Sequence, residues 1–454
     1  MRRPGRGLLL GLAVWLAVAA HAAAAPPEPG RQIMVLLRLP PEHFRAGAGY
    51  SGDYGDGLGH SGRLRIAEQL AREHGLTLTD DWPMPVVGVE CFVMTVPAGR
   101  SPADEMASLA QDKRVDSVEP INLYRAQARS GPAGGSAGGS ASRSGAGTAE
   151  PNDPLFRAQP AAKAWRLADL HQLATGRGVR VAVIDSTVDT RHPDLAGQVA
   201  LSRNFVTGGG EAPEQHGTGV AGVIAALADN GQGIAGIAPH ARLMALRACW
   251  QQATGPNGAA DTVCDSLSLA KALEFAITHD AQVINLSLSG PPDPLLGRLL
   301  DAALARGLTV VGAFDGALPD GGFPASHAGV IAVSDDPAGP KPGSTYVAPG
   351  RNVPTTQPQG RWFLVNGSSY AAAHVSGLFA LLREEKSSAR GAAALVAAHH
   401  GGGVIDACAS LIQAAGSREC ACAHPPESMA RALALAAAGG SPAGGRSGAG
   451  AGRR

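Results

Sequence analysis

The sequence contains little charge and no excess of either sign. Only 17% of its 454 residues are Asp, Glu, Lys or Arg, and 38 basic residues are matched by 38 acidic ones. Surfaces that bind nucleic acid normally carry a basic excess, and an acidic solvating tail would shift the balance the other way. The composition therefore indicates no strongly charged partner and argues against nucleic-acid binding.

Long apolar runs are also missing after the first residues. No later segment approaches the ~18 apolar residues that a membrane-spanning helix needs. The first residues combine Arg2, Arg3 and Arg6 with an apolar run over 8–20 and a following group of alanines, which is the pattern of a secretory signal peptide. We therefore expect residues 1–25 to be cleaved and the mature protein to be secreted or periplasmic. An uncleaved membrane anchor is the alternative.

Glycine, in contrast, is abundant, with 61 residues beside 33 prolines. The excess fits either disorder or a fold with many tight turns. Part of it lies in two low-complexity segments, 126–150 and 439–454. We interpret the first of these as a linker between a unit at 31–125 and a larger unit at 151–415. The glycines outside both segments indicate the turn chemistry of a folded domain.

Export makes the cysteines informative, because thiols pair readily in an oxidising compartment. There are six: Cys91, Cys249, Cys264, Cys408, Cys420 and Cys422. Cys249 and Cys264 would close a short loop, whereas Cys408 would fix the C-terminal tail, 416–454, through Cys420 or Cys422. Cys420, Cys422 and His424 can also be read as metal ligands, although the further ligand spacing of a zinc site is missing.

The first unit has the pattern of a small α+β domain. Ser101 is suited to cap a helix whose first residue is Pro102. The order of the predicted strands and helices is typical of a split, ferredoxin-type β-α-β-β-α-β arrangement. We have no functional interpretation of the glycine-rich insertion at 47–62. The patterns predict strands over 32–38, 89–97 and 115–121 and helices over 64–74 and 102–113.

In the second unit, apolar strand patterns alternate with helical ones. This alternation predicts an α/β fold in which helices cover both faces of a parallel sheet. Ligands of such sheets bind beyond the carboxyl ends of the strands. Strand patterns occupy 179–185, 241–249, 281–289, 308–314 and 329–334, and helical patterns occupy 217–227, 266–279 and 298–307.

Three polar residues lie at the ends of such strands and helices, where ligands are expected to bind. Asp185 ends the first strand, His216 opens a helix and Ser369 opens another. Acyl transfer by a serine needs a hydroxyl, an imidazole that takes its proton and a carboxylate that orients the imidazole. Each residue alone is more often a turn former, a structural histidine or a helix cap. Together, in the order Asp, His, Ser, they point to a catalytic triad.

The strings around these residues resemble those of the subtilisin-like serine peptidases, the subtilases. They are VAVIDS followed by HPDL, then HGTGVAG, and GSSYAAAHVSG. The resemblance covers about 150–415 and implies a subtilisin-like sheet with Asp185 as orienting acid, His216 as general base and Ser369 as nucleophile. The unit at 31–125 resembles the family's inhibitor-like propeptide, which assists folding, blocks the cleft and is then cut away.

The chain departs from the family pattern at several positions. Thr187 replaces a glycine and Ala373 replaces a proline, but neither belongs to the triad. Asp315 stands where the family has the oxyanion-hole asparagine. An ionised Asp315 would accept rather than donate a hydrogen bond, whereas a protonated one would still donate. We therefore predict a slower peptidase with an acid-shifted pH optimum.

The resemblance also suggests where substrate binds. The strand Leu286, Ser287, Leu288, Ser289 and Gly290 resembles the family's cleft-lining strand, to which substrate adds as a β-strand. No acidic cluster accompanies it, so apolar or broad specificity is favoured over dibasic specificity. We expect no cofactor: calcium binding is possible but unsupported, because the segment 228–233 is shorter than the calcium loop of classical subtilisins.

These patterns favour a secreted serine endopeptidase made as a zymogen, with peptide or protein substrates and its own propeptide as an intramolecular inhibitor. The departures at Thr187, Ala373 and Asp315 leave an alternative, a catalytically weak or inactive scaffold with a binding or regulatory role. An esterase with the same triad is less favoured, because α/β-hydrolases order these residues differently and carry a GxSxG elbow.

Overall fold

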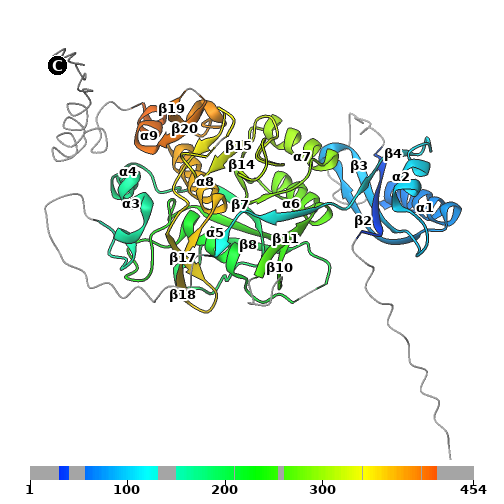
Figure 1. Ribbon diagram of the computed structural model, residues 1–454, viewed down its shortest axis with the longest axis horizontal. Coiled ribbons are helices and arrows are strands. Elements are labelled where there is room, and N and C mark those ends of the chain that lie inside the picture. Colours follow the sequence, from blue (N-terminus) through cyan, green and yellow to red (C-terminus); the bar gives the residue numbers. More distant parts are fainter. Residues whose placement is uncertain are drawn as a thin grey trace, which may run out of the picture.

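The computed structural model describes residues 30–39, 57–130, 150–208, 210–253, 260–339, 341–399 and 401–416. A small N-terminal unit packs against one end of a larger α/β unit, and the chain crosses from the first to the second as an extended segment (Figure 1). The predicted signal peptide and the glycine-rich end of the chain lie outside the described residues, as do Cys420, Cys422 and His424.

The N-terminal unit has the predicted β-α-β-β-α-β order. Its antiparallel sheet has the strand order β2-β3-β1-β4. The strand missing from the sequence prediction is β2, and α1 begins earlier and α2 ends earlier than predicted. Ser101 caps α2 as expected, accepting a hydrogen bond from the Asp104 N–H at 3.3 Å. The elements are β1 (Gln32–Arg38), α1 (Gly57–His74), β2 (Thr77–Met84), β3 (Val89–Thr95), α2 (Pro102–Leu109) and β4 (Val115–Pro120).

Strand β1 is apolar almost throughout because both faces of its sheet are covered. Ile33 and Val35 pack with the helices of their own unit. Met34 and Leu36, which point the other way, share a core with α6 (Ser266–Thr278) and α7 (Pro294–Ala305) of the larger unit. Alternate residues of a strand face opposite sides, so one strand contributes to two cores. The two units are thus joined through a continuous apolar interface.

The larger unit is built on a nine-stranded sheet with the order β19-β20-β16-β15-β14-β12-β7-β9-β8. The strands pair in parallel, except β19 with β20. The parallel α/β architecture predicted from the sequence is confirmed. The strands are β7 (Arg180–Asp185), β8 (Val199–Asn204), β9 (Arg242–Arg247), β12 (Val283–Leu286), β14 (Thr309–Ala313), β15 (Ile331–Ser334), β16 (Tyr346–Val347), β19 (Val396–His399) and β20 (Gly402–Asp406).

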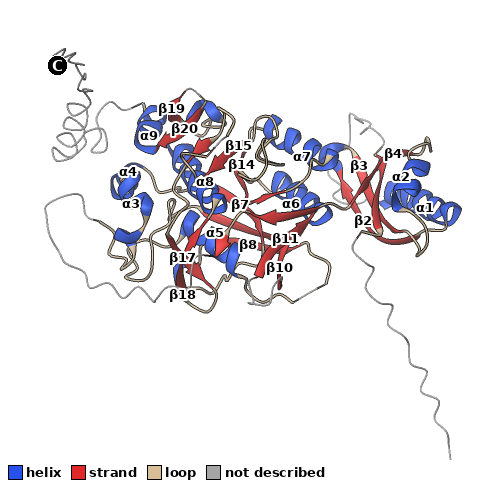
Figure 2. Ribbon diagram, viewed as in Figure 1, coloured by secondary structure: helices blue, strands red, loops and turns tan. Residues whose placement is uncertain are grey.

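Helices lie on both faces of this sheet (Figure 2). Val181 and Val183 of β7 belong to the core formed with α5 and α8, whereas Ala182 and Ile184 belong to the core that contains α6 and α7. Among the described residues, none of the helices is both long enough and apolar enough to cross a bilayer. The further helices are α3 (Pro160–Ala164), α4 (Leu167–Leu173), α5 (Gln215–Ala225), α8 (Ser368–Glu385) and α9 (Ala407–Ala415).

Two smaller sheets border the carboxyl end of the large one. The first has the order β10-β11-β5-β13 and the second β17-β18-β6. In both, a strand from the segment that follows the N-terminal unit pairs with strands of the larger unit. These strands are β5 (Leu123–Ala126), β6 (Arg129–Ser130), β10 (Cys249–Ala253), β11 (Ala260–Asp265), β13 (Leu288–Ser289), β17 (Val353–Gln357) and β18 (Arg361–Asn366).

Cys249 and Cys264 form a disulfide, which is one of the pairings considered above and joins β10 to β11. Cys91 is a buried free thiol in β3. Cys408 lies in α9, but its predicted partners fall outside the described residues.

Candidate active site

Asp185 and His216 form a buried pair at the carboxyl end of the large sheet. The carboxylate is the last residue of β7 and the imidazole lies at the start of α5. His216 Nδ1 lies 2.7 Å from Asp185 Oδ1, and the two side chains are 5% and 3% exposed. A carboxylate can only accept here, so Nδ1 carries the proton and Nε2 presents its lone pair. Nε2 has no hydrogen-bond partner among the described residues.

The turn after Asp185 fixes this pair. Ser186 donates its N–H to Asp185 Oδ1 at 2.7 Å, and its hydroxyl accepts the Gly217 N–H at 3.0 Å. A Cβ on Gly217 would lie 2.2 Å from the Ser186 carbonyl oxygen, so the close approach of α5 requires glycine there. Thr187 exchanges two 2.8 Å hydrogen bonds with Glu214, one through its N–H and one through its carbonyl. Thr187, which departs from the family pattern, is therefore held in place by Glu214.

Ser369 lies in the first turn of α8. Its N–H donates to the Gln127 carbonyl at 3.1 Å, and its hydroxyl donates to the Ser287 carbonyl at 2.9 Å. Gly367, just before the helix, has φ +134°, and a Cβ there would lie 2.3 Å from the Gln127 oxygen. The start of α8 thus presents a backbone N–H to a carbonyl of the chain's own N-terminal region, where a side chain on residue 367 would collide.

Strand β5 lies beside Ser369 in the space between β11 and β13, which we call the groove. It pairs antiparallel with β11 on one side and with β13 on the other. Ser287 accepts the Gln127 N–H at 3.3 Å, and Leu288 and Ser289 pair with residues of β5. Gly290 lies against the ring of Tyr124. Four of the five predicted substrate-contacting residues therefore line this groove.

The fifth predicted residue, Leu286, has a different position. It belongs to the large sheet, where it pairs with Ile184 and Gly312, and it is buried. The groove is lined from Ser287 onward, where the chain leaves the large sheet.

Asp315 follows β14 and is half-exposed. Its Oδ1 accepts the Ala317 N–H at 2.9 Å, and its backbone N–H donates to the Gly321 carbonyl. Among the hydrogen bonds of the described residues, none joins Asp315 to the Gln127 carbonyl. The carboxylate therefore caps a turn here, and the donor bound to the Gln127 oxygen is the Ser369 N–H.

The segment 228–233, considered above for calcium, is held by hydrogen bonds. The Asp194 carboxylate accepts from Asn230 Nδ2 at 2.9 Å, from the Ile234 N–H at 3.1 Å and from Trp362 Nε1 at 2.7 Å. A cation would bind through the oxygens of this carboxylate, and these N–H donors already occupy them. The arrangement stabilises the loop through nitrogen donors.

A second group of metal-type side chains lies in the N-terminal unit. The ligand atoms of His60, Asp81 and Glu90 lie within 4.8 Å of one another. Glu90 is fully buried, and its two oxygens contact His60 Nδ1 and Arg63 Nε. The guanidinium already supplies positive charge to this carboxylate, so the group is an ion-pair cluster within the N-terminal unit.

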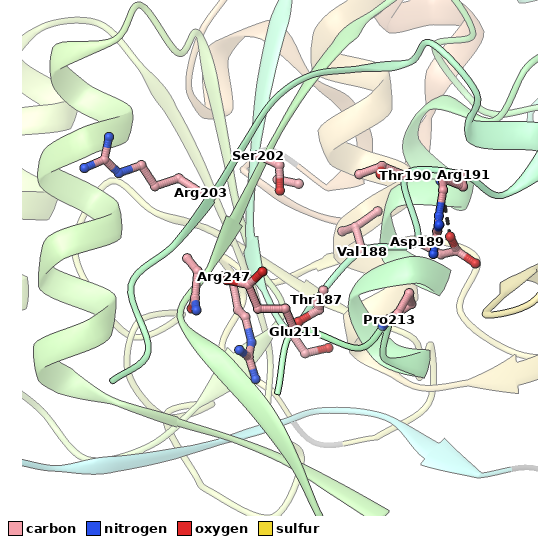
Figure 3. Close-up of a pocket in the computed structure, with 13 residues that line it drawn as sticks. Thr187, Val188, Asp189, Thr190, Arg191, Ser202, Arg203, Glu211, Pro213 and Arg247 are labelled. Carbon is pink, nitrogen blue, oxygen red and sulfur yellow. Dashed lines mark hydrogen bonds between the residues drawn. The ribbon is translucent and has the colours of Figure 1, made fainter. Parts of the chain in front are cut away.

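A polar pocket of about 270 Å³ lies next to the turn that follows Asp185 (Figure 3). Arg247 and Glu211 lie near each other in it, whereas the Arg203 side chain points away. Arg203 instead lies over Phe275, 5.3 Å from the ring centroid. The lining carries both signs of charge, including that of Asp189.

Sequence reasoning missed two parts of the site. It did not identify β11 as the second wall of the groove, although the β-branched pair Thr262 and Val263 before the 266–279 helix was a signal. It also treated 126–150 as a linker, whereas residues up to Ser130 are extended and paired with the larger unit.

Comparison with known proteins adds to this geometry. The model of the Subtilase family matches residues 176–399. Thermitase from Thermoactinomyces vulgaris is 32% identical over 257 residues, 52% of this chain and 86% of thermitase. Subtilisin Savinase from Lederbergia lenta is 36% identical over 223 residues, 46% of this chain and 78% of that protein.

Two further similarities extend the comparison. The major intracellular serine protease of Bacillus subtilis (strain 168) is 33% identical over 229 residues, 46% of this chain and 69% of that protein. The crystal structure of fervidolysin from Fervidobacterium pennivorans, a keratinolytic enzyme related to subtilisin, matches with a TM-score of 0.59 and 21% identity. It covers 84% of this chain and 61% of that one. The likeness to fervidolysin concerns the fold.

Proposed function

Because this chain belongs to the subtilase family of serine endopeptidases, we propose that Asp185, His216 and Ser369 are its catalytic triad. Ser369 would attack the substrate carbonyl, His216 Nε2 would take the serine proton, and Asp185 would hold the imidazole in the required tautomer. The 2.7 Å contact between Asp185 and His216 and the unpartnered Nε2 support these roles.

Catalysis requires a change at Ser369. Its hydroxyl donates to the Ser287 carbonyl, so the side chain must turn toward His216 before its proton can be transferred. The Ser369 N–H is already aimed at a carbonyl oxygen and would stabilise the negative charge that develops there. The nucleophile's own helix thereby supplies one oxyanion donor.

We further propose that the chain is made as a zymogen whose N-terminal unit blocks the cleft. One observation carries this proposal: the Gln127 carbonyl accepts from the Ser369 N–H while β5 fills the groove between β11 and β13. An incoming peptide would need the same hydrogen-bonding edges, because substrate strands add to sheet edges through their backbone. The N-terminal unit and substrate therefore compete for one site.

We also propose that the protein is exported to the cell exterior or the periplasm. The signal-peptide pattern of residues 1–25 supports this. The disulfide between Cys249 and Cys264 supports it independently, because such bonds persist in oxidising compartments. Fractionation of cells that produce the whole chain, compared with a chain lacking residues 2–25, tests the proposal. Retention of the whole chain in the cytoplasm would contradict it.

The triad assignment is tested by Ser369→Ala with Ser368→Ala as the matched control. The Ser368 hydroxyl donates to Asp335 at 3.0 Å, so the neighbouring serine has a different partner. We expect a fluorophosphonate probe to label the wild type and Ser368→Ala but not Ser369→Ala, and casein hydrolysis to follow the same pattern. Labelling of Ser369→Ala would refute the assignment. A folded wild type that is neither labelled nor active would favour the inactive-scaffold alternative.

A further inference from the structure

We propose that the polar pocket beside the turn that follows Asp185 binds a small oxyanion, either a carboxylate or a phosphate, through Arg247 and Thr187. The residues that line this pocket belong neither to the triad nor to the strands of the groove. The inference therefore goes beyond the proposed function and does not depend on it.

The pocket lies at the carboxyl end of the large sheet (Figure 3). It is formed by the turn after β7, the ends of β8 and β9 and the segment before α5. Its volume is about 270 Å³, whereas about 15 Å³ is enough to hold one water molecule. The pocket thus has room for an anion of several atoms.

Arg247 is a buried cation whose donors lack an acceptor. The residue is 6% exposed, and its Nε and Nη1 have no hydrogen-bond partner among the described residues. Glu214 Oε2 lies 3.8 Å from Nε, beyond hydrogen-bonding distance, and already accepts the Thr187 N–H at 2.8 Å. Glu214 therefore offsets the charge but leaves the guanidinium N–H groups unused. Buried charged groups in proteins are normally hydrogen-bonded, so these donors indicate a missing acceptor.

Thr187 supplies a second polar group without a partner. Its hydroxyl is buried and makes no hydrogen bond within the described part of the chain. Thr187 stands where the family pattern has glycine, so the reaction shared by the family does not require this hydroxyl. Thr187 and Arg247 come from separate strand ends and line the same pocket. An oxyanion would satisfy both, because its oxygens accept from a planar guanidinium and from a hydroxyl.

The acidic residues of the lining do not take the place of such a ligand. The Asp189 carboxylate accepts the Arg191 N–H at 3.2 Å and the Gln359 N–H at 3.0 Å, and Figure 3 shows it apart from Arg247. Glu211 is exposed, and in the described part of the chain no ion pair joins it to Arg247. The donors of Arg247 are therefore left to a ligand.

The site adjoins the residues that hold the buried acid and base. Arg247 pairs in register with Asp185 across β9 and β7. Thr187 exchanges hydrogen bonds with Glu214, which lies two residues before His216. A bound anion would connect the end of β9 to this turn, so we expect it to stabilise the folded chain.

The test measures Tm of the full chain carrying Ser369→Ala while sodium acetate or sodium phosphate replaces sodium chloride at constant ionic strength. We expect Tm to rise with both anions, because a ligand of the native state stabilises that state. Adding Arg247→Gln should raise the Kd fitted from this rise by about tenfold to a hundredfold, since charge-assisted hydrogen bonds are lost. Arg203→Gln is the matched control. Arg203 also lines the pocket, but its side chain points away and lies over Phe275.

Thr187→Val gives a second readout, which keeps the test decisive if Arg247→Gln does not fold. It replaces only the hydroxyl and should raise Kd by about two- to tenfold. A rise in Tm with acetate alone or with phosphate alone would support the site and identify its ligand as a carboxylate or a phosphate.

Three outcomes would overturn the inference. They are no rise in Tm with either anion, an equal rise in the parent and in Arg247→Gln, and an unchanged Kd in Thr187→Val. A loss of binding in Arg203→Gln as large as that in Arg247→Gln would likewise contradict the assignment to Arg247. None of these outcomes affects the triad assignment, which is tested by labelling of proteins that retain Ser369.

Discussion

Asp315 is the residue most at odds with the chemistry proposed for this site. Its Oδ1 already accepts the Ala317 N–H, a hydrogen bond that an asparagine oxygen would accept equally well. If residue 315 reaches the oxyanion, as the resemblance to the family implies, an asparagine would in addition offer an N–H to it, whereas an ionised carboxylate would repel it. We predict that Asp315→Asn raises kcat at neutral pH by up to roughly a thousandfold.

Initial rates of wild type and Asp315→Asn with the same peptide substrate test this prediction. Equal rates would show that Asp315 has no part in stabilising the oxyanion.

Gly367 provides a second prediction at this scale. Its φ of +134° disfavours any side chain, and a Cβ would collide with the Gln127 oxygen. We expect Gly367→Ala to lower peptide hydrolysis by about a hundredfold, because displacing the attacked carbonyl by about 1 Å has costs of that order. Gly343→Ala is the control, since a Cβ at Gly343 would meet nothing within 4 Å. Equal activities of Gly367→Ala and wild type would contradict the close approach described above.

At the scale of elements, periodicity identified the long helices and the buried strands, and it failed on the short ones. Strands such as β7 and β14 are apolar because helices cover both sheet faces, and that pattern is visible in the sequence. β5 and β6 carry no such pattern. They are held by backbone hydrogen bonds to strands far away in the chain, and local composition does not encode those contacts.

The contact between the N-terminal unit and helices α6 and α7 should depend on pH. Glu119 accepts the Leu295 N–H at the start of α7, and Glu274 of α6 accepts the Val86 N–H. Burial raises the pKa of Glu119 from 4.5 to about 7, with a further contribution from Asp293 and an opposing one from Arg298. Burial likewise raises the pKa of Glu274 to about 7.

The sign of the dependence follows from these shifts. The docked state binds protons more tightly than the separated units, so docking is strongest below about pH 4.5 and weakens as the pH rises through about 7. We predict that the cleaved N-terminal unit co-elutes with the processed enzyme in gel filtration at about pH 5 and dissociates from it near pH 8. Glu119→Gln with Glu274→Gln should flatten this dependence. Tighter docking at the higher pH would contradict the account.

The disulfide between β10 and β11 should stabilise one wall of the groove. Its two cysteines are separated by 15 residues in the sequence, and closing a loop of that size contributes about 3 kcal/mol. We predict that the double variant Cys249→Ser, Cys264→Ser unfolds at lower denaturant concentration and binds β5 less firmly. Cys91 is left unchanged in both proteins, since it is unpaired and buried. An unchanged unfolding midpoint in the double variant would rule out this role.

At the scale of the whole molecule, the sequence predicted both units, the residues proposed as the triad and a propeptide that blocks the cleft, but not which residues lie in the groove. Asp185, His216 and Ser369 lie in strings that can be recognised locally. The position of Gln127 depends instead on the docking of a whole domain, whose sheet shares an apolar core with α6 and α7. That docking places the residues after the N-terminal sheet, which form β5, beside the nucleophile.

The central claim is that the triad of this chain cuts the segment lying across it. The most direct measurement compares intact masses of wild type and Ser369→Ala after both are produced in a cell-free system without added protease. The account predicts that the wild type separates into two fragments, the second beginning at Ala128, and that Ser369→Ala stays uncut at this bond. Cleavage of Ser369→Ala between Gln127 and Ala128 at the wild-type rate would contradict it.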